Sequence, residues 1–186
     1  MIRAFVGIPV PPEVRSALVG AKVGLGVGRL VPEENFHLTL AFLGDHPEPT
    51  IEDVHDGLSV IQAAPVEIKS VGLGTFGEAR PRALFADVEA NPPLRALRKK
   101  VRQAVRDHGI ELSAERFHPH ITLARFGSGL LGEDAAAVGE FMARNAHRAE
   151  ADFLAESFCL YRSHLGKHGP IYDVLAEYPL SASTVA

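Results

Sequence analysis

The sequence predicts an α+β fold made of two similar halves, each with a βαβαββ order of elements. Two near-identical segments, His37-Leu38-Thr39-Leu40-Ala41 and His120-Ile121-Thr122-Leu123-Ala124, mark the halves. A similar order of apolar strands and amphipathic helices surrounds each segment, at an offset of about 80 residues. We therefore expect a single domain over residues 1–186, with an internal duplication at roughly 1–80 and 81–180.

Over residues 1–89, strands are predicted from apolar and β-branched runs at 2–9, 37–43, 66–76 and 82–89. Pro11-Pro12 begins a helical pattern that ends near Gly24. A second helix is expected from about Thr50, with Thr50 as the N-cap and Asp53 in an acidic first turn. The last two predicted strands are joined by a turn rich in Gly, Pro and Arg.

The second half repeats this order. Its predicted elements are a helix at about 92–107, a strand at 120–125, a helix at about 133–146 and strands at about 150–162 and 170–177. The two halves also share a similar short sequence: Arg3-Ala4-Phe5-Val6-Gly7 resembles Arg82-Ala83-Leu84-Phe85-Ala86. Duplication would place the two His-containing segments at equivalent positions about a pseudo-twofold axis.

The repeated segments carry residues suited to acid–base chemistry. Residues at i and i+2 of a strand share a face, so each segment presents one imidazole and one hydroxyl beside buried apolar residues. Near pH 7, one histidine of a pair can accept a proton while the other donates one. The hydroxyls of Thr39 and Thr122 can hydrogen-bond the oxygens of a phosphate.

Two residues follow the motifs at equivalent positions. Arg125 can clamp a phosphate bidentately, although regular alternation points it away from His120 unless a bulge intervenes. Phe42 can stack on a nucleobase. The structural alternatives are a surface salt bridge for Arg125 and a core aromatic for Phe42.

Composition limits the classes of function. The apolar fraction of 46% and charged fraction of 23% are those of an ordinary globular protein. The net charge of −4 provides no global field for nucleic acid, so contacts with RNA must be local. Cys159 is the single cysteine and is expected to be buried, which suits a reducing, cytoplasmic location. No signal peptide and no membrane-spanning run is expected.

Other short motifs in the sequence do not have the spacing that their usual functions require. The segment Gly24-Leu25-Gly26-Val27-Gly28 has the wrong spacing for dinucleotide binding, and no P-loop supports the use of ATP. His118-Pro119-His120 lacks the carboxylates or cysteines that would complete a metal site. We therefore expect neither a metal nor a cofactor. His118 is interpreted as a cleft residue or an exposed bystander.

The predicted helix over 94–106 carries six basic residues opposite an apolar stripe: Arg95, Arg98, Lys99, Lys100, Arg102 and Arg106. A solvated polar face is the favoured interpretation. The alternative is a track for an RNA backbone, which predicts that charge reversal there weakens RNA binding.

Three stretches resemble the 2H phosphoesterase family, and in particular the RNA 2′,3′-cyclic phosphodiesterases, historically called 2′-5′ RNA ligases. They are the segments at 31–44, at 117–125 and from Leu160-Tyr161-Arg162-Ser163 through Gly169-Pro170-Ile171-Tyr172-Asp173-Val174-Leu175. The resemblance implies a two-lobed, pseudo-symmetric α+β fold of antiparallel sheets, with the motifs facing across a central cleft.

The resemblance also implies roles for individual residues. His37 would be the proton donor to the 3′ oxygen, His120 the proton acceptor that activates water, and Thr39 and Thr122 would hold the phosphate. Arg125 would contact the phosphate, and the terminal base would stack on Phe42. The expected enzyme is a monomer that opens 2′,3′-cyclic phosphates at RNA ends or on nucleotides to a 2′-phosphate. Reversal would give weak ATP-independent ligation.

Two other functions stay open on the sequence. One is a cyclic phosphodiesterase for small substrates such as ADP-ribose 1″,2″-cyclic phosphate. The other is a non-catalytic module that binds RNA ends. The presence of both motif histidines favours an enzyme over a binding module.

Overall fold

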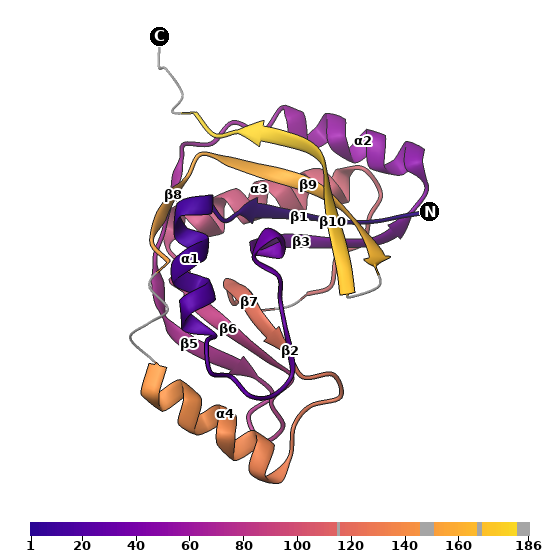
Figure 1. The fold of residues 1–186 in the computed structure, drawn as a ribbon. Coiled ribbons are helices and arrows are strands. Elements are labelled where there is room, and N and C mark those ends of the chain that lie inside the picture. The colour runs from indigo at the N-terminus through magenta and orange to yellow at the C-terminus, as the bar shows by residue number, and fades with distance from the viewer. Residues whose placement is uncertain (115, 146–150, 167–168, 182–186) are drawn as a thin grey trace.

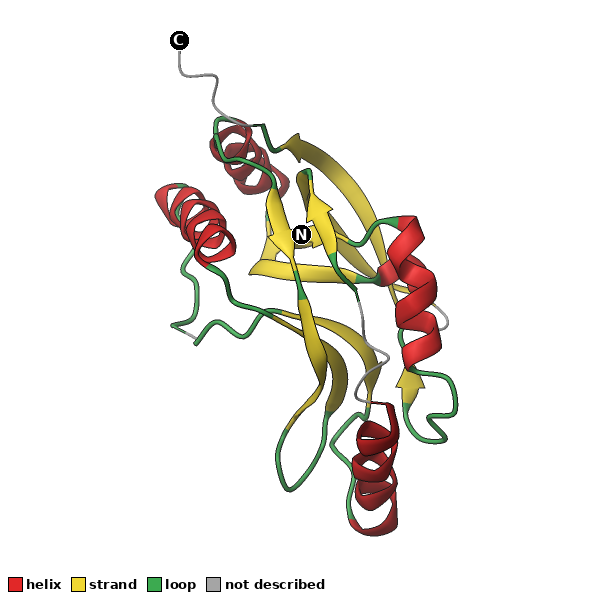
Figure 2. Ribbon diagram, turned by 90° about the vertical axis from the view of Figure 1, so that its left-hand side faces the viewer, coloured by secondary structure: helices red, strands yellow, loops and turns green. Residues whose placement is uncertain are grey.

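The computed structural model describes residues 1–114, 116–145, 151–166 and 169–181 and arranges them as one long sheet flanked by helices (Figures 1 and 2). In spatial order the sheet contains β10 (Gly169–Pro179), β9 (Ser157–Gly166), β1 (Ile2–Pro9), β3 (His37–His46), β7 (His120–Arg125), β6 (Ala83–Val88) and β5 (Ser70–Phe76), with β2 (Arg29–Leu30) beside β7. The paired strands run antiparallel. A second sheet pairs β4 (Val66–Ile68) with β8 (Phe153–Ala155).

The helices are α1 (Pro12–Ala21), α2 (Glu48–Ser59), α3 (Pro92–Asp107) and α4 (Gly132–Asn145), with a 3₁₀ turn, η1, at Glu33–Asn35. The N-cap predicted at Thr50 is wrong, because α2 already begins at Glu48 with Pro47 at the cap position. The acidic residue of its first turn is Glu48, not Asp53. Pro49 in the first turn has a φ already close to the helical value, so the chain enters the helix before Thr50.

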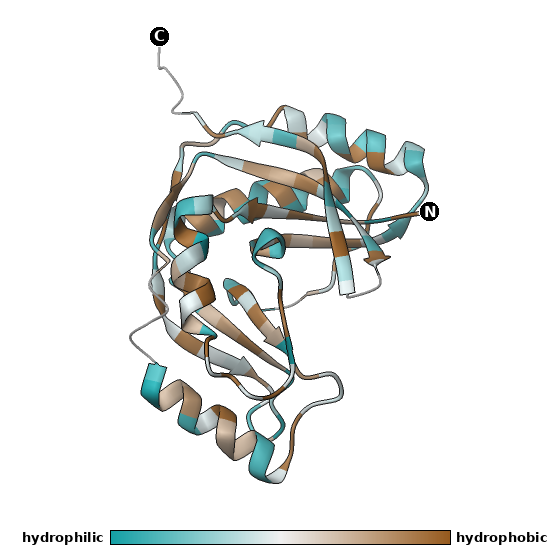
Figure 3. Cartoon of the chain, in the orientation of Figure 1, coloured by the Kyte–Doolittle hydropathy of each residue, from teal (hydrophilic) through white to brown (hydrophobic). Residues whose placement is uncertain are grey.

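The predicted strand at 66–76 is two strands in different sheets, β4 and β5. At the start of α3, the Asn91 side chain accepts a hydrogen bond from the Leu94 amide and caps the helix (2.9 Å). Hydrophobic residues concentrate on the inner strands, while the helices alternate between hydrophobic and hydrophilic faces (Figure 3). On α3 the buried stripe consists of Leu94, Leu97, Val101 and Val105.

The two motif strands meet at the centre of the sheet. β3 and β7 are joined through one register pair, Leu38 with Ile121, and both side chains are fully buried. These residues hold the same place in the two motifs, immediately after the histidine. Because the pairing is antiparallel, a local twofold axis relates the motifs. The two motif strands are adjacent and antiparallel, and they lie side by side in one continuous sheet.

Each motif strand contains a bulge at the same place. In the pairing of β1 with β3, Leu40 is the extra residue of β3, and in the pairing of β6 with β7, Leu123 is the extra residue of β7. Both lie three positions after their histidines. A bulge breaks the alternation of side chains. The leucine and the following alanine are therefore both buried, and the next residues, Phe42 and Arg125, are exposed.

Strand pairing shifts the alignment of the two similar segments by one residue. The sequence comparison aligns Val6 with Phe85. In the structure Gly7 pairs with Thr39 and Phe85 pairs with Thr122, so Gly7 and Phe85 are the equivalent residues. The difference matters because a one-residue shift moves every side chain of a strand to the opposite face.

Cys159 is buried on β9, as predicted. Burial raises the pKa of its thiol to about 11, which keeps it protonated near neutral pH. Within the described residues, the helices are too short or too polar to cross a membrane.

Candidate active site

The ring of His37 is fixed at the start of β3 by its backbone and by aromatic neighbours. Its Nδ1 donates a hydrogen bond to the carbonyl oxygen of Asn35 (2.7 Å). The ring packs against Phe5, with centroids 4.6 Å apart, and meets the edge of Tyr172 at 5.1 Å. Since a carbonyl only accepts hydrogen bonds, Nδ1 carries the proton. Nε2 is therefore the ring nitrogen left for proton transfer.

His120 repeats this arrangement at the start of β7. Its Nδ1 donates to the carbonyl oxygen of His118 (2.8 Å), again two residues before the motif histidine. Phe76 and Phe85 enclose the ring, at centroid distances of 4.7 and 5.1 Å. Both imidazoles thus have the same tautomer imposed by the backbone and offer Nε2 to a substrate.

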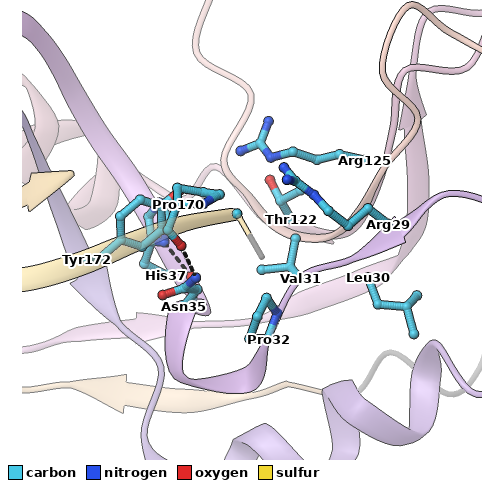
Figure 4. Close-up of a pocket in the computed structure, with 11 residues that line it drawn as sticks. Arg29, Leu30, Val31, Pro32, Asn35, His37, Thr122, Arg125, Pro170 and Tyr172 are labelled. Carbon is cyan, nitrogen blue, oxygen red and sulfur yellow. Dashed lines mark hydrogen bonds between the residues drawn. The ribbon is translucent and has the colours of Figure 1, made fainter. Parts of the chain in front are cut away.

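Across the central strand pair, the histidine of each motif lies beside the threonine of the other motif. In antiparallel register, the residues that flank Leu38 and Ile121 lie crosswise, with His37 beside Thr122 and Thr39 beside His120. One pocket contains His37 and Thr122 (Figure 4). The neighbouring pocket contains His120 and Thr39. Each histidine therefore shares its pocket with the hydroxyl of the other motif.

Arginines face His37 from the opposite wall of its pocket. Arg125 and Arg29 extend from β7 and β2 toward the side that His37, Pro170 and Tyr172 close (Figure 4). Regular alternation would point Arg125 away from His120, and a different orientation is expected from the sequence only where a bulge intervenes. The bulge at Leu123 reverses that orientation and brings Arg125 into the pocket of His37 and Thr122.

Phe42 is not a core aromatic. Its side chain is 64% exposed and lies 5.8 Å from the ring of Phe5. It lines both the pocket of His120 and a larger groove of about 820 Å³ that also contains Arg125 and Tyr172. An exposed ring at the border of two pockets offers a face for stacking.

The protein's own groups favour neutral imidazoles at this site. Burial lowers the pKa of His37 to about 4, and the positive charge of Arg125 and the nearby His120 act in the same direction, against the opposing hydrogen bond to Asn35. Burial also lowers the pKa of His120, with Asp87 acting in the opposite direction. A neutral imidazole can serve as a base at once, whereas a general acid must first gain a proton.

Sequence reasoning missed several parts of the site. The carbonyl of Asn35 orients His37, and Tyr172 and Arg29 line the pocket. His118, interpreted from the sequence as a cleft residue or an exposed bystander, lines the pocket of His120. Its carbonyl accepts the hydrogen bond from His120, and its Nε2 lies 2.9 Å from Oδ1 of Asp87. A backbone acceptor leaves no signature in residue identity. The signal that could have found it is position, because both acceptors lie two residues before a motif histidine.

In the part of the chain that the structure describes, no group of three or more His, Cys, Asp or Glu side chains could hold a metal ion. The charged side chains around His37 are instead arginines. The arrangement can hold an anion and move protons to and from it.

A sheet whose two central strands each carry a His-x-Thr motif, with arginines opposite the first histidine, defines a two-histidine phosphoesterase. Residues 26–167 match the model of the 2′-5′ RNA ligase superfamily. The chain belongs to this superfamily.

Curated relatives are similar in sequence to this protein over most of the chain. An RNA 2′,3′-cyclic phosphodiesterase of Bacillus subtilis is 31% identical over 183 residues, which cover 95% of this chain and 96% of the relative. A protein of the same name from Thermus thermophilus is 32% identical over 191 residues, covering 96% and 90%. A third, from Geobacillus stearothermophilus, is 32% identical over 95% of this chain, which spans 56% of that relative's length.

Solved structures share the fold. A crystal structure of a Thermus thermophilus protein superposes with a TM-score of 0.78 at 32% identity and covers 98% of this chain and all of the other. A crystal structure of E. coli LigT complexed with 3′-AMP has the same TM-score at 23% identity, with 97% and 99% covered. The α+β, mostly antiparallel architecture predicted from the sequence is confirmed.

Proposed function

We propose that this protein hydrolyses the 2′,3′-cyclic phosphate at the 3′ end of RNA and leaves a 2′-phosphate. The observation that carries the proposal is the crosswise pairing of His37 with Thr122 and of His120 with Thr39 on adjacent strands. Relatives of about 31% identity that bear the name RNA 2′,3′-cyclic phosphodiesterase support the substrate.

In the proposed reaction, Nε2 of His120 takes a proton from water, and the water oxygen attacks phosphorus. The bond from phosphorus to the 3′ oxygen breaks, and Nε2 of His37 gives a proton to that oxygen. No covalent intermediate forms, and no metal is used. The two proton transfers are each worth about 10²–10⁴-fold in rate.

The remaining site residues hold the substrate. Thr39 and Thr122 donate hydrogen bonds to the non-bridging oxygens, and Arg125 clamps the phosphate with its guanidinium. Phe42 stacks on the terminal base. The bulges that expose Arg125 and Phe42 support these assignments, because they bring both side chains to the borders of the two pockets.

Substrate binding is what prepares the acid. A phosphodiester anion beside an imidazole favours its charged form and raises its pKa. The protein's own groups hold the pKa of His37 at about 4, so the bound anion has to supply the charge that stabilises the imidazolium.

The protein is further proposed to act as a cytoplasmic monomer, with one domain duplicated at roughly 1–80 and 81–180. One chain supplies both histidines, and the equivalent bulges at Leu40 and Leu123 support the duplication. Light scattering at working concentration tests the monomer, because a dimer mass would contradict it.

Incubation of a 2′,3′-cyclic mononucleotide with excess chelator tests the proposed activity, and phosphorus NMR identifies the product. A 2′-phosphate is the expected product. A 3′-phosphate product would show that the 2′ oxygen, and not the 3′ oxygen, is the leaving group. Binding without turnover would show that the protein is a module that recognises RNA ends.

The same step joins RNA when a hydroxyl takes the place of water as the nucleophile. The 5′-hydroxyl of a second RNA attacks phosphorus in place of water, the 3′ oxygen leaves, and a 2′–5′ bond forms without ATP. A mixture of an RNA with a cyclic end and an RNA with a 5′-hydroxyl tests this reaction, and the absence of a joined product at high RNA concentration would exclude it.

A further inference from the structure

The outer face of α3 and the chain before β7 form a basic groove of about 250 Å³, here called the α3 groove. Its lining residues are Arg95, Arg98, Lys99, Arg102, Gln103, Arg106 and Phe117. The five charged members are all positive, in a chain whose net charge is −4. A concave site lined by one sign of charge concentrates the field and attracts a polyanion.

The α3 groove continues into the pocket of His120. Arg98, Arg102 and Phe117 line both cavities, and the pocket beyond them contains His120 and Thr39. A chain that ends in this pocket can therefore extend along α3. The alternative interpretation, a merely solvated face of α3, does not account for a groove that leads to His120.

The shared wall is fixed by contacts between α3 and the segment that precedes β7. The guanidinium of Arg98 lies over the ring of Phe117, 4.3 Å from its centroid. Nη2 of Arg102 donates to the carbonyl oxygen of Ser113 (2.7 Å). Lys99 and Arg106 complete the wall farther from His120, since they line the α3 groove and not the His120 pocket.

We propose that the α3 groove binds the phosphate backbone of the RNA segment attached to the reacting 3′ nucleotide. This inference rests on the proposed function and deepens it, because it assigns oligomeric RNA, and not small cyclic phosphates, as the substrate that the molecule is built to hold. The contacts are to phosphates and so carry little sequence preference.

The decisive variant is Lys99→Glu/Arg106→Glu, which reverses two charges of the α3 groove and leaves the contacts of Arg98 and Arg102 in place. The matched control is Lys100→Glu/Arg144→Glu, which makes the same change in net charge. Lys100 lies on another face of α3, where its Nζ donates to the carbonyl oxygen of Gln62, and Arg144 is an exposed residue of α4.

Both variants and the wild type are assayed on a 2′,3′-cyclic mononucleotide and on an RNA of about ten nucleotides with a cyclic end. The groove variant is expected to raise KM for the oligomer about tenfold, with a salt slope shallower by about 1.4 for two lost single-strand contacts. The KM of the groove variant for the mononucleotide is expected to stay within about twofold of wild type. The control variant is expected to keep its KM for both the mononucleotide and the oligomer within the same range.

An unchanged KM for the oligomer, or an equal rise in the control variant, overturns the inference. Binding of a fluorescent ten-nucleotide RNA that ends in a 2′-phosphate separates this result from failure of the proposed function. If the wild type turns over neither substrate, the proposed function fails, and weaker binding by the groove variant alone still supports the α3 groove.

Discussion

His37 and Thr122 belong to different motifs and line one pocket, while Thr39 lies in the pocket of His120. Each pocket therefore contains parts of both halves of the chain. The cause is the single register pair between Leu38 and Ile121, which brings the motifs together in opposite directions. The proposed mechanism requires both histidines, and the predictions below follow from their surroundings.

His37→Ala and His120→Ala are each expected to lower kcat by about 10²–10⁴-fold with chelator present, because each removes one proton transfer. The measurement is turnover of a 2′,3′-cyclic mononucleotide. His46→Ala is the matched control, since His46 ends the same strand and bonds the carbonyl oxygen of Leu43 away from the motif. Near-wild-type turnover by either motif variant would contradict the two-histidine mechanism.

The pH dependence of kcat/KM should have its optimum below pH 6.5. The active free enzyme carries one proton on its two motif histidines, and burial lowers the pKa of both, that of His37 to about 4. The rate therefore falls as pH rises and the second imidazole becomes neutral. A kcat/KM optimum above pH 7.5 would show that the lowered pKa values do not govern the free enzyme.

Binding of an anion at pH 7 should be accompanied by proton uptake. His37 is neutral in the empty site because its pKa is about 4, and a bound phosphate raises it. Calorimetry of a 2′-nucleotide in buffers with different ionisation enthalpies measures the protons taken up. His37→Gln is expected to lose part of the uptake, and equal uptake in the variant would place the proton elsewhere.

Arg125→Ala should weaken transition-state binding by about 1.5–3 kcal/mol, the value of hydrogen bonds to charged groups. It should also move the kcat/KM profile to higher pH, because the positive charge of Arg125 lowers the pKa of both motif histidines. Arg125→Lys keeps the charge and loses the bidentate geometry. The lysine variant should therefore retain the wild-type profile at a lower rate, and identical profiles in wild type and Arg125→Ala would exclude the electrostatic role.

Phe42→Ala should weaken nucleotide binding without destabilising the fold, because the side chain is 64% exposed. Stacking of a base on an aromatic ring is worth about 1–3 kcal/mol, so KM is expected to rise more for purine than for pyrimidine substrates. Phe42→Tyr retains the ring and serves as the control. A fall in the unfolding midpoint with unchanged KM would assign Phe42 to packing.

Local sequence signals predicted most elements of the fold. The apolar stripe and flanking residues of α3 (Pro92–Asp107) identified that helix, and the alternation in β7 (His120–Arg125) identified that strand. The signals failed where two strands of different sheets follow one another, as in β4 and β5, because sheet membership depends on distant partners.

The sequence by itself determined the chemistry of the site: two imidazoles, two hydroxyls, and one Arg and one Phe at equivalent positions after the motifs. Only the tertiary structure decided that Arg125 shares the pocket of His37 and that each histidine lies beside the threonine of the other motif. It also decided that backbone carbonyls orient both imidazole rings. The physical reason is that a bulge and a strand neighbour are properties of a pairing. They arise when β3 and β7 meet β1, β6 and each other, and no residue pattern within one strand encodes them.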